Sequence, residues 1–162
     1  MPARSASAES RTELLARYCN APKLLAESVA GSSIAQLDGA PPEPGWTARQ
    51  NVHHVSDIAV MGALRLRLML LDIEVEMWPT DQDTMQKRLR NDKRPIGPAL
   101  KTVEGLIESA VSILGSLREE EWVQPRPMPG NNSRSVEDWL LANTVHIEEH
   151  IDQIRYALTG TC

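Results

Sequence analysis

Apolar residues at helical spacing dominate this chain of 162 residues, and they fall into four long segments. Side chains three and four positions apart share one face of a helix, so each segment can bury one stripe and expose the other. Phenylalanine is absent and aromatic residues make up only 4% of the chain. Because aromatic residues are sparse, a sheet is disfavoured. The pattern predicts an all-α fold: one four-helix bundle domain over residues 1–162, with residues 1–9 as a flexible start.

Caps, prolines and glycines predict where the first helix begins and ends. Ser10 and Glu13 form a capping box, in which each side chain satisfies a free amide donor of the first turn. Pro22 should kink or split this helix near Asn20, since proline cannot donate the helical hydrogen bond. Gly31 is the expected stop.

The other three helices are predicted in the same way. We expect them from Thr47 to about Ile73, from Ala99 to Leu117, and from Ser135 to about Leu158 with Gly160 as the stop. Residues 40–45 and 125–132 read as loops, and residues 77–98 as a long crossover with at most a short helical turn. A long second connection allows two neighbouring helices to run parallel.

Charge and cysteine content exclude several classes of protein. The net charge is −5 and the basic residues are scattered, unlike the basic patch of a nucleic-acid-binding protein. The first ten residues lack the apolar core of a signal peptide. The longest apolar stretch, Ile58 to Leu71, contains Arg65 and Arg67 and so predicts no membrane span. Cys19 and Cys162 form no disulfide framework. We expect a cytoplasmic protein that acts on a small-molecule substrate.

All four histidines lie in two short clusters about ninety residues apart. His146 and His150 are four positions apart, which on a helix places both imidazoles on one face at about 6 Å. A third histidine from a facing helix would complete a three-nitrogen site for a metal, with the fourth position open. The alternative is plain: such a pair is often solvated, and a histidine on an apolar face is usually a core residue.

The neighbours of each histidine on its helix face support a shared site. Steps of three and four give two stripes that mix polar and apolar residues: Gln50, His54, Asp57, Met61 and Arg65, and Trp139, Asn143, His146, His150 and Gln153. A buried polar stripe costs free energy unless its members pair or bind something. We therefore expect the two stripes to face one another.

Roles follow from position within these stripes. His53 points about 100° away from His54, and His54 is the better ligand because it lines up with Gln50 and Asp57. Asp57 could orient a ligand histidine or act as a base, or could be a surface carboxylate. Arg65 could hold an anionic group of the substrate, or could be an ordinary salt-bridged arginine. The remaining candidates for substrate contact are Gln50, Asn143 and Trp139.

With these motifs in view, the chain resembles the DinB/YfiT-like superfamily over nearly its whole length. Gly45 to Asp57 is similar to the family segment GW(S/T)xRQxxHHxxD, and His146 to Ile154 is similar to its closing HxxxHxxQI. The run from Arg65 to Leu68 resembles the family's RxKL. The resemblance implies an up-down-down-up four-helix bundle. It also implies a three-histidine site, here His54, His146 and His150, commonly filled by zinc or nickel.

The resemblance has limits where the pocket rim is expected. Glu149 stands where related chains often carry a histidine, and residues 78–83 only loosely match a proline-acidic-tryptophan segment. Pro127 to Gly130 replaces the HPExG segment. The ligand set therefore carries over, but the substrate does not.

These observations favour a metal-dependent hydrolase, or an S-transferase that uses a bacterial low-molecular-weight thiol as some relatives do. The alternative is a non-catalytic, metal-stabilised bundle that acts as a binding or stress-response module. Metal should be lost as the pH falls through the histidine range, because ligand imidazoles must be neutral. Met69, Leu70 and Met77 look exposed and apolar, and together with the resemblance they predict a homodimer.

Overall fold

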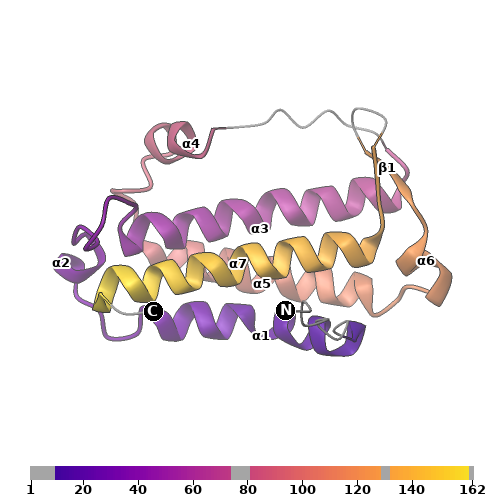
Figure 1. Ribbon diagram of the computed structural model, residues 1–162, viewed down its shortest axis with the longest axis horizontal. Coiled ribbons are helices and arrows are strands. Elements are labelled where there is room, and N and C mark those ends of the chain that lie inside the picture. The colour runs from indigo at the N-terminus through magenta and orange to yellow at the C-terminus, as the bar shows by residue number, and fades with distance from the viewer. Residues whose placement is uncertain (1–9, 74–80, 129–131, 161–162) are drawn as a thin grey trace, which may run out of the picture.

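Four long helices form a bundle in the computed structural model, which describes residues 10–73, 81–128 and 132–160 (Figure 1). The long helices are α1 (Arg11–Ser28), α3 (Ala48–Leu70), α5 (Ile96–Leu114) and α7 (Val136–Thr159). The described connections contain three short helices and a hairpin: α2 (Ile34–Leu37), α4 (Gln82–Arg88), α6 (Glu119–Val123), β1 (Arg126–Met128) and β2 (Asn132–Arg134). The predicted four-helix bundle is confirmed. No helix in the described ranges is long and apolar enough to cross a membrane.

Contacts between helices fix their relative directions. Near the start of α3, the Arg49 guanidinium donates to the Arg94 carbonyl just before α5, and near the end of α3, Arg67 donates to Ser109 of α5. Helices α3 and α5 therefore run parallel. Two pairs between α3 and α7, Asn51 with His150 and Gly62 with Trp139, show that these two helices are antiparallel.

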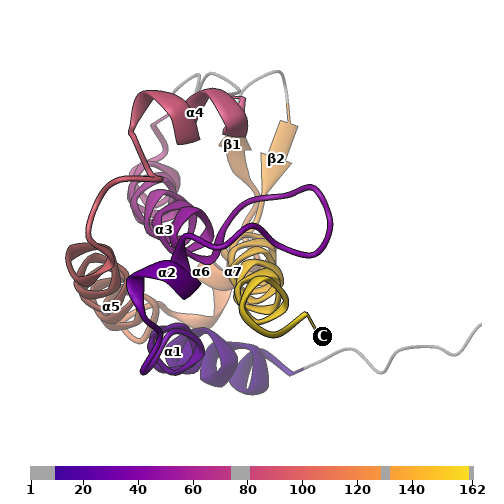
Figure 2. The same cartoon turned by 90° about the vertical axis from the view of Figure 1, so that its left-hand side faces the viewer.

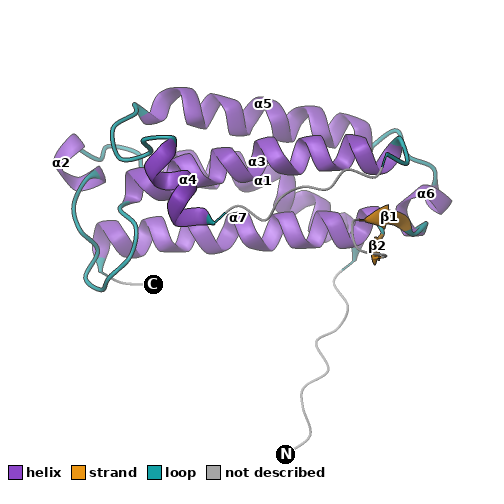
Figure 3. Ribbon diagram, turned by 90° about the horizontal axis from the view of Figure 1, so that it is seen from above, coloured by secondary structure: helices purple, strands orange, loops and turns teal. Residues whose placement is uncertain are grey.

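Helix α1 lies parallel to α7, because Arg11 pairs with Glu137 and Arg17 with Glu148. Viewed end-on, the four long helices occupy the corners of a square, with α4 above α3 (Figure 2). The hairpin and α4 lie near opposite ends of the bundle (Figure 3).

The predicted helix starts are present. Ser10, Thr47 and Ser135 each accept a hydrogen bond from the third residue of their helix, and the side chain of that residue bonds back. Gly160 ends α7 in the left-handed conformation, with φ of 71°, which glycine adopts without strain. The expected split at Pro22 is wrong: α1 continues through it, since buried residues on both sides hold the helix against the core.

Some boundaries differ from the sequence prediction. Helix α3 ends at Leu70 rather than near Ile73, and α5 begins at Ile96 rather than at Ala99. The earlier start is possible because Pro98 lies in the first turn, where its missing N–H is not needed. The segment expected to be a loop around residues 125–132 contains strand β1, in which Arg126 pairs with Arg134 of β2.

Trp139 lies at the centre of the core and has no exposed surface. Its indole N–H donates to the Gly62 carbonyl at 3.1 Å, and its ring meets the Tyr18 ring edge-on at 5.7 Å. Trp139 therefore exposes no surface to a substrate in this structure, and the expected contact stays a prediction. At this level of α7, the helix face that carries Trp139 points into the core, and the indole packs against α1 and α3.

The residues behind the homodimer prediction are only partly exposed. Met69 is buried in the core and Leu70 is partly buried against it. Met77 lies outside the described residues. Oligomeric state therefore stays a prediction.

Candidate metal centre

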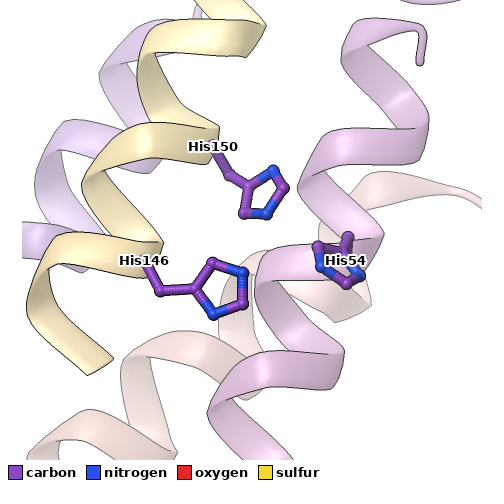
Figure 4. Close-up of side chains that lie close together, drawn as sticks. All are labelled: His54, His146 and His150. Atoms are coloured by element: carbon purple, nitrogen blue, oxygen red, sulfur yellow. The ribbon is translucent and has the colours of Figure 1, made fainter. Parts of the chain in front are cut away.

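Three histidines converge between α3 and α7. His146 and His150 extend from successive turns of α7 toward His54 on α3 (Figure 4). One ring nitrogen from each lies within 4.8 Å of the others. The ring centroids of His54 and His150 are 4.5 Å apart, and those of His146 and His150 are 5.0 Å apart. This is the arrangement that the spacing of the two histidine clusters predicts.

His54 is the histidine whose surroundings most require a ligand. Its side chain is 3% exposed, and neither ring nitrogen has a hydrogen-bond partner. A buried polar group without a partner costs about 1–3 kcal/mol, so native structures rarely leave one. A divalent ion between the three rings would satisfy His54. Imidazole nitrogens suit zinc and nickel, and three protein ligands leave a fourth position open.

Trp46 covers one side of the histidine cluster. Its ring meets the His54 ring edge-on at 4.8 Å and stacks on the His150 ring at 5.9 Å with an 11° angle between planes. The indole N–H donates to Asp83 on α4 at 2.9 Å. The tryptophan of the GW motif thus shields the ligands from one side and connects them to the crossover. The sequence indicates a role for Trp46 only through its place in the GW motif.

Burial keeps the candidate ligands neutral. Burial, followed by the charges of His150 and His146, lowers the pKa of His54 to about 3. Burial, and then the charge of His146, lowers the pKa of His150 to about 4. The pKa of His146 is also lowered by burial. Neutral imidazoles have a free lone pair, so these rings can coordinate metal well below the pH at which ordinary histidines gain a proton.

His53 takes no part in the cluster. It is 2% exposed, and its Nε2 lies 3.0 Å from the Arg94 carbonyl, to which it can donate. Burial lowers the pKa of His53 as well. This side chain joins α3 to the segment before α5, and the core-histidine interpretation applies to it rather than to His54.

Asp57 lies on the His53 side of α3. Its carboxylate accepts a hydrogen bond from Asn91 at 3.1 Å, and burial raises its pKa although Asn91 and the charge of Arg94 act in the opposite direction. Within the described residues, its hydrogen bond goes to Asn91 rather than to a candidate ligand. Asp57 therefore does not orient a ligand histidine. A role as acid or base stays a prediction.

Gln50 and Asn143, two other residues expected to contact substrate, form hydrogen bonds with backbone atoms near their own positions in the chain. The Gln50 side chain accepts a hydrogen bond from the Thr47 amide and caps α3. Asn143, half-buried and one turn before His146, donates to the Trp139 carbonyl at 2.8 Å.

Arg65 is eleven positions after His54, or roughly 16 Å along the helix axis. It is half-buried, and burial together with the charge of Arg134 lowers its pKa. A substrate group bound there would have to extend far from the three histidines.

A pocket of about 410 Å³ adjoins the outer side of the cluster. The Pro-rich segment from Pro41 to Trp46 forms one wall, and Asn51, His150, Gln153 and Tyr156 contribute to the others. Volumes of this size are typical of small-molecule sites. The sequence does not indicate a functional role for Asn51, because this residue lies outside the helix stripe that contains His54.

Known proteins share this chain's sequence pattern and fold. A protein of Geobacillus thermodenitrificans is 30% identical over 115 residues, which are 71% of this chain and 65% of that protein. A protein of Oceanobacillus iheyensis is 29% identical over 143 residues, which are 84% of this chain and 78% of that protein. Both carry the name "Putative metal-dependent hydrolase".

A solved structure is similar throughout. YfiT from Bacillus subtilis, described as a probable metal-dependent hydrolase with an unusual four-helix bundle topology, superposes with a TM-score of 0.83. The alignment covers 100% of this chain and 94% of that one at 22% identity, and it establishes the fold. Residues 17–154 match the family described as the DinB superfamily. This match includes both histidine clusters, the whole of α3 and α5 and most of α1 and α7, and the chain belongs to the DinB superfamily.

Proposed function

We propose that this protein is a metal-dependent hydrolase that holds one divalent ion, zinc or nickel, on His54, His146 and His150. The observation that carries the proposal is His54, a buried side chain with two unpartnered ring nitrogens next to two other neutral imidazoles. The names of the relatives support hydrolysis as the reaction class.

The ion in such a site supplies a Lewis acid that polarises a substrate carbonyl and lowers the pKa of water. The chain contributes the rest. Three imidazoles bring one ring nitrogen each within 4.8 Å of the others, and three ligands would leave a further position for a substrate atom. Trp46 excludes water from one side of the rings. Asp57, one turn after His54 and with a raised pKa, is our candidate for moving a proton.

A second candidate function is S-transfer from a bacterial low-molecular-weight thiol. The 410 Å³ pocket beside His150 favours it, because a transferase needs space for a thiol cofactor next to its ligands. The Gln153 amide and the Trp46 ring would contact the cofactor there. The thiolate would then be presented to an electrophilic substrate at the three histidines.

Elemental analysis joined to a substrate screen separates these possibilities from a non-catalytic module. A hydrolase cleaves esters or amides, and a chelator stops it. An S-transferase consumes an electrophile only when a thiol is added. Metal at one equivalent that raises the melting temperature, without turnover in either screen, favours the metal-stabilised module. No bound metal in protein purified without chelator, and none taken up on titration, overturns all three.

A further inference from the structure

His150 is the one candidate ligand whose second ring nitrogen has defined partners among the described residues. Its Nδ1 lies 3.0 Å from Asn51 Oδ1 and 3.0 Å from Gln153 Oε1. Asn51 is 1% exposed and comes from α3, whereas Gln153 is exposed and comes from the same helix as His150. Both partners are amides, so the position of the proton depends on which way each amide faces.

The backbone at the start of α3 fixes the orientation of the Asn51 amide. Its Nδ2 donates to the Thr47 carbonyl at 3.1 Å and lies 3.3 Å from the Trp46 carbonyl. Carbonyl oxygens only accept hydrogen bonds. A flipped amide would place Oδ1 against these two oxygens, so Oδ1 must face His150. Because that oxygen can only accept, His150 Nδ1 must carry the proton.

We propose that Asn51 is a positioning residue that holds His150 in the Nδ1-protonated tautomer, with Nε2 bare and directed toward His54 and His146. The same amide connects the ligand to the carbonyl of Trp46, the residue that covers the cluster. The tautomer follows from the protein alone, whereas its effect on metal affinity rests on the proposed function. Asn51 has the larger effect of the two amides, since a hydrogen bond shielded from water is stronger than an exposed one.

Nitrogen NMR of ¹⁵N-histidine-labelled, metal-free protein at pH 8 tests the tautomer directly. The wild type is expected to show His150 with a protonated Nδ1 and a bare Nε2. Asn51→Ala should produce a mixture of tautomers. A wild-type His150 protonated on Nε2 would overturn the proposal. The wild-type spectrum alone decides this point, so the test depends neither on bound metal nor on the folding of a variant.

Zinc affinity, measured by competition with a chromophoric chelator, tests the consequence. Loss of a partner that orients a ligand histidine costs about 10–100-fold in metal affinity. We expect that loss for Asn51→Ala and a smaller loss for Gln153→Ala. Asn91→Ala is the matched control, because Asn91 is equally buried but bonds to Asp57 rather than to a ligand.

Two results would contradict the assignment to Asn51. One is an Asn51→Ala protein with the wild-type tautomer and affinity, combined with a loss of both in Gln153→Ala. The other is an equal loss of affinity in Asn91→Ala, which would make the effect a general consequence of removing a buried amide. If the wild type takes up no zinc, the proposed function fails while the tautomer measurement still decides the role of Asn51.

Discussion

Gly62 and Asn143 approach so closely that a Cβ added to Gly62 would lie 2.3 Å from Asn143 Oδ1. The missing side chain allows α3 and α7 to meet at the level where the Trp139 indole bonds to the Gly62 carbonyl. His54 lies two turns before Gly62, and His146 lies one turn after Asn143. This close contact therefore helps to set the separation of the two helices that carry the candidate ligands.

We predict that Gly62→Ala is less stable than Gly105→Ala by about 1–3 kcal/mol, the usual cost of overpacking a core. Gly105 lies in α5 with nothing within 4 Å of an added Cβ, so its substitution should stabilise the helix by roughly 0.5–1 kcal/mol. Urea denaturation measures both. In the double variant Gly62→Ala, Asn143→Ala the clash is relieved and part of the loss should return. Equal stabilities for the two single alanine variants would show that Asn143 moves aside without cost.

Alanine substitution of single histidines should separate ligands from the core histidine. His54→Ala, His146→Ala and His150→Ala are expected to lose bound zinc or nickel in elemental analysis. His53→Ala should keep the metal and lose about 0.5–1.5 kcal/mol of stability, because the Arg94 carbonyl keeps Arg49 as a donor and loses only the bond to His53. If His54→Ala keeps its full metal content while His53→Ala binds no metal, His53 rather than His54 is the ligand.

The metal-free protein should lose stability as the pH falls below about 6.5. Burial, followed by the charges of neighbouring histidines, lowers the pKa of His54 to about 3 and that of His150 to about 4, from the ordinary histidine value of 6.5. Between these limits the unfolded chain binds protons that the folded chain does not, so acid favours unfolding. Denaturant unfolding in EDTA between pH 7.5 and 4.5 measures the slope. His54→Ala should show a shallower slope, and an unchanged slope would mean that other groups cause it.

Asp57→Asn should keep metal affinity and lower turnover. The carboxylate bonds to Asn91 rather than to a candidate ligand, so its removal leaves the three imidazoles in place. Loss of a positioned acid or base costs about 10²–10⁴ in rate. Metal content and turnover on a substrate from the screen are measured on one preparation. A variant that turns over like the wild type would make Asp57 a structural carboxylate, and a metal-free variant would give it a role in binding the ion.

We predict a homodimer, as the resemblance to the family implies. Light scattering at micromolar concentration measures the mass directly. The protomer mass is 18.0 kDa, so a dimer should approach twice that value. A mass that stays at one protomer across the concentration range would contradict the prediction.

Features encoded locally were predictable from the sequence. The capping boxes at Ser10 and Thr47 depend on residues three positions apart, and the meeting of His146 with His150 depends on four. The short helices α2 and α6 and the hairpin were not predictable, because elements of three to five residues carry too little periodicity. Their positions depend on tertiary contacts.

The burial of Trp139 and the contacts of Asn51 were not predictable, for a common physical reason. Trp139 shares a face of α7 with His146, yet it is fully buried while His146 is not. A helix face is a wide stripe, and only the neighbouring helices decide where along it the core ends. Asn51 escaped notice because its partners, Trp46 and His150, lie on a loop and on another helix. The spacing of residues along one helix carries no information about contacts with a loop or with another helix.

The parallel course of α3 and α5 has a consequence for the order of events during synthesis. Neighbouring long helices in an up-and-down bundle can pair as soon as the second one is made, but here the chain must return along the bundle before α5 begins. The principal partner of α3 at the histidines is α7, and His54 precedes His146 by 92 positions. Such distant pairings form slowly. A nascent chain therefore holds a single candidate ligand until its last helix is made, so an ion that requires all three histidines can bind only after that.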